Sequence, residues 1–177
     1  MRIIGGDLKG KAILPPAGYK ARPTTDFAKE GLFNSLANQF DFESLSVLDL
    51  FSGTGSISFE FASRGCRDII AIEMNPANAN FIKKSAASLK IKMQVVHHNV
   101  FDFLEICTKQ FDLVFADPPY AIEGLGTIPD KVFSHNILKE DGMLILEHPG
   151  TYSFENHPRF VKERRYGNVH FSWFKAS

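Results

Sequence analysis

An Asp-Pro-Pro-Tyr tetrapeptide at residues 117–120 directly follows the apolar run 111–116. In open α/β sheets, ligands bind just beyond the carboxyl ends of such buried strands. The two prolines remove two backbone N–H donors, which leaves carbonyl oxygens and the Asp117 carboxylate as acceptors. An exocyclic aromatic amine needs such acceptors, because giving up its hydrogens to them frees the nitrogen lone pair for attack. Asp117 and Pro118 are therefore predicted catalytic residues, with Tyr120 as a ring face on which a flipped base stacks.

A glycine-containing turn and a later acidic residue have the pattern of a nucleoside-cofactor site. Gly53 and Gly55 follow the apolar run 46–51, and Glu73 ends the next apolar run about 20 residues further on. The glycines let the backbone approach a ligand, and a helix expected after them presents free N–H groups there. Glu73 is placed to accept hydrogen bonds from both hydroxyls of a ribose. A tight turn beside a solvated strand end gives the same pattern, so the glycines alone do not establish a cofactor site.

The identity of residue 58 narrows the choice of cofactor. Dinucleotide-binding loops carry a third glycine at this place, whereas this chain has Ser58, which weakens a pyrophosphate site. A two-glycine loop after an acidic strand residue suits a cofactor without phosphates, and S-adenosylmethionine (SAM) fits. Asp49 is then predicted to meet the ammonium of the cofactor's amino-acid end, and Phe51 to contact the cofactor beside the loop.

The elements that must position these residues alternate between strand-like and helix-like patterns. Short apolar runs typical of buried parallel strands occupy residues 46–51, 68–73, 94–97, 111–116 and 143–147. Helix-like segments lie between them at residues 56–64, 76–89 and 101–108. This alternation predicts an α/β fold with a Rossmann-like, doubly wound and mostly parallel sheet.

Two extensions flank this core. Residues 1–4 and 11–14 are predicted to pair as a small N-terminal hairpin, and a helix is expected to start at Thr25-Asp26. Residues 160–166 and 169–174 are expected to close the chain as an antiparallel C-terminal hairpin. We therefore expect a single domain over residues 1–177, with residues 1–24 as an N-terminal extension and residues 25–177 as the catalytic core.

The amino-acid composition limits which classes of protein this chain can belong to. The 177 residues are 44% hydrophobic and 23% charged, which is ordinary for a globular protein and excludes disordered and fibrous classes. Two cysteines make neither a disulfide framework nor a metal site, so we expect a reducing, cytoplasmic setting. No apolar stretch approaches the ~20 residues that span a bilayer, and the first residues lack a secretory signal.

The net charge is zero at pH 7, yet the charges are unevenly distributed. Residues 1–30 hold six basic and three acidic side chains, and residues 159–177 hold five and one. Basic ends can offer a polyanion an attractive face on a protein that is neutral overall. The predicted contacts to RNA phosphates are Lys9, Lys11, Arg164 and Arg165.

Taken together, the motifs resemble the RsmD family of SAM-dependent methyltransferases, which methylate the 2-amino group of a guanine in 16S ribosomal RNA. The resemblance rests on the opening MRIIGG, on Arg22-Pro23-Thr24 with the EGLFN that follows, and on VLDLFSGTG, Glu73 and DPPY. It implies a class I methyltransferase fold, with Arg22 and Thr24 beside the active site. It also implies that Asn99 and Val100 flank the cofactor adenine, and Met74 is predicted to join them.

The sequence therefore predicts methyl transfer from SAM to a guanine amine of 16S ribosomal RNA, in the small subunit or its assembly intermediate. We expect a monomer that needs no metal and no membrane. Two alternatives stay open: a DNA adenine amino-methyltransferase, and a non-catalytic ribosome-assembly factor that binds RNA. The length leaves no separate domain to read DNA sequence. Replacement of Asp117 by asparagine is expected to leave little activity, because an amide oxygen accepts one amine hydrogen but brings no negative charge to balance the cation forming on nitrogen.

Overall fold

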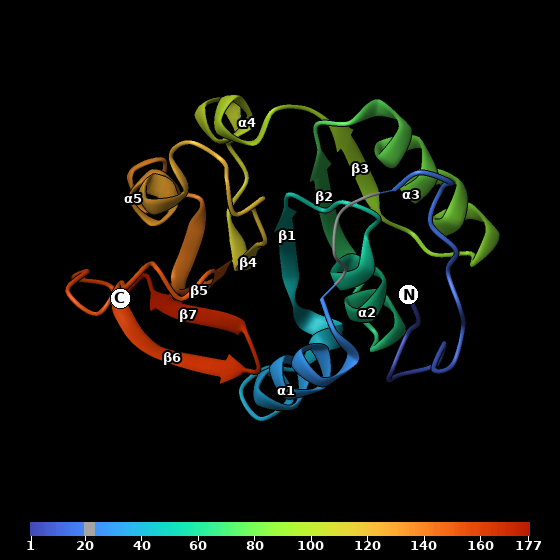
Figure 1. The fold of residues 1–177 in the computed structure, drawn as a ribbon, viewed down its shortest axis with the longest axis horizontal. Helices are drawn as coiled ribbons and strands as arrows, with labels where there is room; N and C mark the ends of the chain where they lie inside the picture. The colour runs from blue at the N-terminus through green and yellow to red at the C-terminus, as the bar shows by residue number, and fades with distance from the viewer. Residues whose placement is uncertain (20–23) are drawn as a thin grey trace.

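A seven-stranded sheet with the order β3-β2-β1-β4-β5-β7-β6 forms the centre of the computed structural model, which describes residues 1–19 and 24–177 (Figure 1). The strands are β1 (Ser46–Leu50), β2 (Asp68–Glu73), β3 (Gln94–His97), β4 (Phe111–Ala116), β5 (Leu138–His148), β6 (Phe160–Tyr166) and β7 (Val169–Lys175). Strands β1 to β5 run parallel, whereas β7 is antiparallel to both of its neighbours. The predicted α/β fold with a C-terminal antiparallel hairpin is confirmed.

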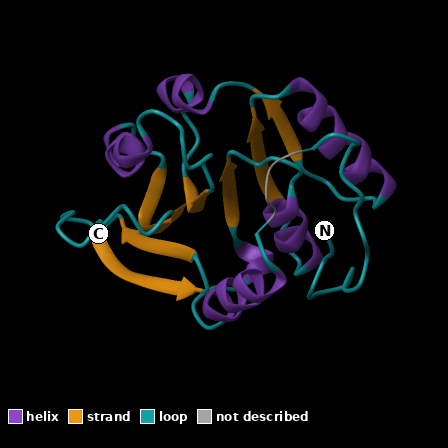
Figure 2. Ribbon diagram, viewed as in Figure 1, coloured by secondary structure: helices purple, strands orange, loops and turns teal. Residues whose placement is uncertain are grey.

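Helices cover both faces of the sheet (Figure 2). They are α1 (Asp26–Ala37), α2 (Ser56–Ser63), α3 (Pro76–Ser88), α4 (Val100–Ile106) and α5 (Ile128–Ser134), with short 3₁₀ turns η1 (Phe42–Ser44) and η2 (Leu125–Thr127). Side chains alternate between the faces of a strand, so Val47 packs with α1 and α2 while Leu48 packs with α4 and α5. Within the described residues, no helix combines the length and the apolarity needed to cross a membrane.

Three elements differ from the sequence expectations. β1 ends at Leu50, because Phe51 has left-handed backbone geometry (φ 58°) and begins the turn. β5 starts at Leu138 rather than at residue 143, and its pairing with β4 shifts register near Phe111. α5 was not predicted, because seven residues with Pro129 near the start are too short to show a helical period.

The N-terminal extension packs beside α2 and α3 (Figure 1). Its predicted hairpin is reduced to one antiparallel bridge, Arg2 with Ala12, where the Ile3 N–H donates to the Lys11 carbonyl at 3.0 Å. Ile3 and Ile13 are buried in a cluster that includes residues of both helices. This packing fixes the segment that leads to the carboxyl ends of the strands.

Candidate active site

The carboxyl ends of the parallel strands open into a cavity of about 1080 Å³. Loops after β1, β2 and β4 line it together with the end of β5, the start of α1 and the β6–β7 turn. Most residues expected from the sequence lie around it, namely Thr24, Asp49, Phe51, Gly53, Glu73, Met74, Asn99, Val100, Asp117, Pro118 and Tyr120. A smaller cavity of about 440 Å³ is lined by residues of the N-terminal extension and of α1.

The loop after β1 is held in a tight turn that only small residues allow. Gly53 and Gly55 have φ angles of 59° and 84°, in the left-handed region where a side chain is strained. A Cβ on Gly53 would lie 2.8 Å from the hydroxyl of Tyr19, and one on Gly55 would lie 2.9 Å from the Phe59 ring. Gly55 does not line the cavity and instead caps the N-terminus of α2. The loop therefore presents bare backbone to whatever occupies the cavity.

Glu73, at the end of β2, is fixed across this loop. Its Oε2 accepts the Gly53 N–H at 2.6 Å, and its Oε1 accepts the Asn75 N–H at 3.0 Å. The side chain is nearly buried, yet it lines the cavity. A carboxylate offers about four acceptor positions, so each oxygen keeps one for a ligand. Two neighbouring acceptors of this kind match the two hydroxyls of a ribose.

Asp49, near the end of β1, is a buried acidic residue that lines the cavity. The hydroxyl of Ser58 donates to its Oδ2 at 2.6 Å. Burial and, to a smaller extent, the negative charge of Glu73 raise the pKa of Asp49 to about 7. A cation bound beside Asp49 would relieve this penalty. Ser58, where a dinucleotide loop has glycine, therefore orients this carboxylate.

Apolar side chains and one amide form another wall of the cavity. The Phe51 and Phe101 rings meet edge to face with centroids 6.2 Å apart, and Val100, the first residue of α4, is buried. Asn99 caps α4, because its Oδ1 accepts the Asp102 N–H at 3.2 Å. Its amide oxygen is therefore engaged by the helix, while the residue still borders the cavity.

The other end of the cavity is acidic. Asp117 follows β4, and Glu147 lies near the end of β5 and is buried. Burial and the charge of Glu147 raise the pKa of Asp117 well above its ordinary value, and burial raises the pKa of Glu147. The hydroxyls of Tyr120 and Thr24 both donate to Glu147, at 3.3 Å and 3.2 Å. This end can therefore accept several N–H donors from a ligand.

The predicted RNA-contacting residues lie outside the cavity. Lys9 and Lys11 are exposed on the N-terminal extension. Arg164 and Arg165 are exposed on β6, close to the β6–β7 turn at the cavity rim, and Arg165 donates to Glu163 at 3.0 Å. Arg22 lies outside the described residues.

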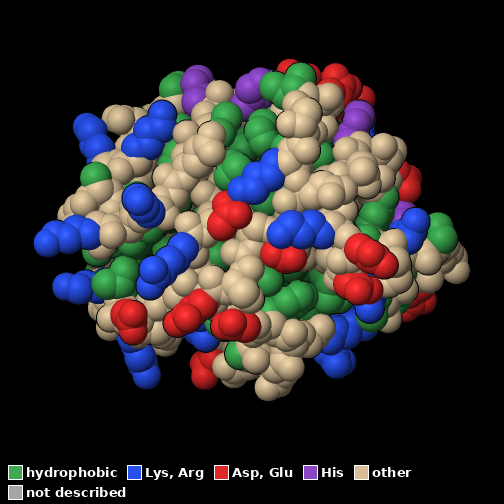
Figure 3. Space-filling model, turned by 180° about the vertical axis from the view of Figure 1, so that it is seen from behind, with side chains coloured by type: hydrophobic (Ala, Val, Ile, Leu, Met, Phe, Trp, Pro, Cys, Tyr) green, Lys and Arg blue, Asp and Glu red, His purple; other side chains and the backbone are tan. Residues whose placement is uncertain are grey.

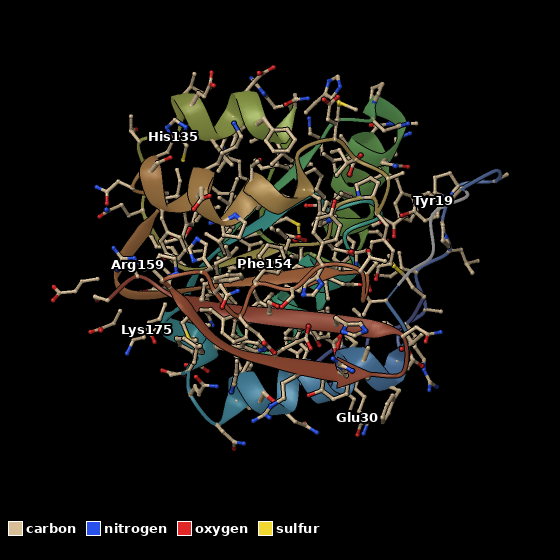
Figure 4. All side chains as sticks on the ribbon, turned by 60° about the vertical axis from the view of Figure 1, so that its left-hand side comes forward. Tyr19, Glu30, His135, Phe154, Arg159 and Lys175 are labelled. Atoms are coloured by element: carbon tan, nitrogen blue, oxygen red, sulfur yellow. The ribbon has the colours of Figure 1, made fainter. Side chains whose placement is uncertain are left out.

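The structure adds cavity residues that the sequence did not single out. They are Tyr19 from the N-terminal extension, Phe27 of α1, Phe101 of α4, Glu147 of β5 and Tyr166 of β6. Figure 4 shows Tyr19 on the side of the molecule opposite Arg159 and Lys175. Glu147 ends a predicted strand, so the rule that located Asp117 at a strand's carboxyl end could have found it. The aromatic residues carried no such signal. In the described parts of the chain, no group of three or more His, Cys, Asp or Glu could hold a metal ion.

Comparison with known proteins places the chain in a family. Residues 1–175 match the family model described as Conserved hypothetical protein 95. Over 145 residues the chain is 34% identical to Ribosomal RNA small subunit methyltransferase D of Escherichia coli strain K12, covering 81% of this chain and 69% of that protein.

Solved structures share the fold. The protein yhhF of Escherichia coli superposes with a TM-score of 0.85 at 30% identity, covering 99% of this chain and 97% of that chain. The T. Thermophilus 16S rRNA N2 G1207 methyltransferase (RsmC), solved with AdoMet and guanosine, gives a TM-score of 0.70. At 18% identity, covering 91% of this chain and 45% of that one, it shows the fold alone. By its family match and its relatives, the chain belongs to the RsmD family of methyltransferases.

Proposed function

We propose that this protein transfers a methyl group from SAM to the exocyclic 2-amino group of a guanine in 16S ribosomal RNA. The observation that carries the proposal is the cavity, which joins the Glu73 loop at one end to Asp117 and Tyr120 at the other. Its volume of about 1080 Å³ exceeds the roughly 300–1,000 Å³ of ordinary ligand pockets, which leaves room for a cofactor and a base. The relative in Escherichia coli is named for small-subunit ribosomal RNA methylation, and RsmC for the N2 of a guanine.

The charges of the cavity lining favour this cofactor over a dinucleotide. Its acidic side chains are Asp49, Glu73, Asp117, Glu123 and Glu147, and no described Lys, Arg or His lines it. Phosphates would find no positive side chain there, whereas a sulfonium and an ammonium would be attracted. Gly53 has no side chain, so its backbone can approach the cofactor closely beside the Tyr19 hydroxyl. The residues present therefore fit SAM.

Each wall of the cavity would hold a different part of the cofactor. When bound, SAM supplies an electrophilic methyl carbon on a sulfonium. Glu73 accepts hydrogen bonds from the ribose hydroxyls with the positions its backbone contacts leave free. Asp49 faces the ammonium of the amino-acid end, which holds this carboxyl in its ionised form. Phe51 and Val100 provide apolar contacts for the adenine ring.

The acidic end of the cavity would orient the guanine amine. Asp117 and the carbonyl oxygen of Pro118 accept its two hydrogens, which leaves the nitrogen lone pair directed at the methyl carbon. As the nitrogen–carbon bond forms, the electron pair of the carbon–sulfur bond stays on sulfur. The proton that the amine then loses passes to the acidic end of the cavity, where Asp117 and Glu147 are the available carboxyls. Tyr120, which is 44% exposed, offers its ring to the flipped base.

The direct test is product analysis. Small subunits that lack the endogenous modification, incubated with the protein and labelled SAM, are expected to yield 2-methylguanosine after digestion to nucleosides. Methyladenosine as the only product would contradict the guanine assignment while leaving methyl transfer intact. A calorimetric titration without SAM binding at millimolar concentration would instead favour the non-catalytic RNA-binding factor.

The basic side chains proposed to contact RNA lie in two separate parts of the surface. Seen from behind, Lys and Arg side chains spread along one side of the molecule, with acidic side chains lower on the same face (Figure 3). The two predicted groups belong to different parts of the fold, the N-terminal extension and β6. α1, with Asp26 and Glu30 exposed, contacts β6 and borders the smaller cavity next to the extension. Each basic group therefore needs its own test.

We expect charge reversal at the RNA surface to weaken RNA binding and leave SAM affinity unchanged. The variants are Lys9→Glu with Lys11→Glu, and Arg164→Glu with Arg165→Glu. Fewer counterions are released when fewer phosphates are contacted, so the Michaelis constant for subunits rises and its salt dependence becomes shallower.

Lys139→Glu with Lys175→Glu is the matched control, because these lysines lie at the other end of β5 and β7, away from the cavity. The measurement is kcat/KM on subunits at several salt concentrations. A variant pair with the wild-type salt slope would remove that pair from the RNA surface.

We further propose that residues 1–177 act as one methyltransferase domain, with 1–24 as an extension over the cofactor site. The place of Tyr19 beside the Gly53 loop supports this arrangement. A monomer working in the cytoplasm without a metal, on the small subunit or its assembly intermediate, stays part of the proposal.

A further inference from the structure

Glu147 stands at the same level of the sheet as Asp117. β4 and β5 pair in parallel with Ala116 opposite Leu146, so Asp117 and Glu147 are the next residues along two adjacent strands. Glu147 is 6% exposed, and both residues line the cavity. The reacting end therefore contains a second acid besides Asp117.

Three groups hold the Glu147 carboxyl in place. The Tyr120 hydroxyl donates to Oε1 at 3.3 Å, and the Thr24 hydroxyl donates to Oε2 at 3.2 Å. Asp117 forms a hydrogen bond with it from the adjacent strand. Since a carboxylate offers about four acceptor positions, one remains for a ligand. Glu147 is therefore fixed by its neighbours and can still accept one more donor.

The two neighbouring carboxyls resist ionising together. Burial and the adjacent Glu147 raise the pKa of Asp117, and burial raises the pKa of Glu147. A second negative charge beside the first is unfavourable for two adjacent carboxyls. Asp49 is the other acid whose charge reaches Asp117. The pair therefore favours one negative charge over two, and each side chain keeps an acceptor for a ligand.

Resting on the proposed function, we propose that Glu147 accepts the ring N1–H of the target guanine while Asp117 accepts a hydrogen of its 2-amino group. Guanine presents these two donors side by side. Adenine and cytosine instead have a ring nitrogen beside the amine that is itself an acceptor. Two acceptor oxygens therefore match guanine and oppose the other bases, and a site built around hydrogen-bonding groups rejects a ligand that lacks the partner. Glu147 is thereby a specificity-determining residue.

The test compares RNA that carries the target guanine with RNA that carries 2-aminopurine at the same position. 2-Aminopurine keeps the 2-amino group, but its ring N1 has no hydrogen. For the wild-type protein, kcat/KM on 2-aminopurine RNA should fall by about tenfold to a hundredfold, the range for a lost hydrogen bond to a charged group. Glu147→Ala should be slowed on guanine RNA but lose little more on 2-aminopurine RNA. The missing 6-oxygen affects both proteins alike and cancels in the comparison.

Glu147→Gln is the second variant, because it keeps the size of the side chain and one oxygen that can accept from Tyr120 or Thr24. It should discriminate between the two RNAs less than the wild type does, and it carries the test if Glu147→Ala fails to bind SAM. Glu155→Gln, an exposed glutamate in the loop after β5, is the control and should match the wild type.

The outcomes separate this inference from the proposed function. If the wild type and both Glu147 variants discriminate equally between guanine and 2-aminopurine, Glu147 does not read N1–H, and the inference is wrong while methyl transfer stands. If the wild-type protein forms no 2-methylguanosine on subunits, the proposed function fails and this inference fails with it.

Discussion

Asp117→Ala is expected to abolish methyl transfer while leaving SAM binding intact. Asp117 is the acid that follows β4 and borders the cavity at the end opposite the Glu73 loop. Without the Asp117 carboxyl, the guanine amine loses an acceptor and keeps its lone pair delocalised in the ring. Removing one such electrostatic contact costs on the order of a hundredfold to a thousandfold in rate. Single-turnover transfer of labelled methyl measures the loss, and calorimetric titration with SAM checks the cofactor site.

Asp117→Asn separates the role of the oxygen from that of the charge. An isolated carboxylate would lose its charge in this variant, which is why the sequence predicts little residual activity. In the structure Asp117 forms a hydrogen bond with Glu147, and an asparagine amide can donate to Glu147 in its place. The Glu147 carboxylate then supplies the negative charge and the amide oxygen still accepts, so Asp117→Asn should retain clearly more activity than Asp117→Ala. Equal loss in both variants would contradict this role of Glu147, and a wild-type rate in Asp117→Ala would remove Asp117 from the chemistry.

Glu73→Ala is expected to weaken SAM binding by roughly 1–3 kcal/mol, the range for a lost charged acceptor. The carboxylate does two things at once, because it faces the cavity and also accepts the Gly53 and Asn75 N–H groups. Its loss therefore removes the ribose partner and loosens the glycine loop. Calorimetric titration gives the affinity, and the thermal unfolding midpoint reports whether the fold is kept.

A cofactor analogue distinguishes these two effects of Glu73. A 2′-deoxy form of SAM lacks one hydroxyl that Glu73 is proposed to bind. It should bind the wild type more weakly than SAM does, but bind Glu73→Ala about as well as SAM does. If the variant keeps wild-type affinity for SAM itself, the ribose assignment is wrong.

The local sequence was enough to predict most of the framework and the location of the site. The five parallel strands follow from apolar runs of the right length, and the glycine turn follows from residues that tolerate left-handed backbone. Glu73 and Asp117 were located because each stands at the carboxyl end of a predicted strand, where open α/β sheets bind ligands. These signals are local, since each depends on a few consecutive residues. The helix α5 was not predicted from the sequence, because it has only seven residues.

The charge state of the acidic end was decided by the tertiary structure alone. Asp117 and Glu147 meet because β4 and β5 pair in one particular register, and Thr24 reaches Glu147 across 123 residues of chain. Tyr19 lies beside Gly53 because the N-terminal extension packs on α2 and α3. A pKa depends on burial and on charges brought close in space. Neither can be predicted from a few consecutive residues. The sequence therefore determined which groups could react, and the register of two strands determined that two acids stand side by side with raised pKa values.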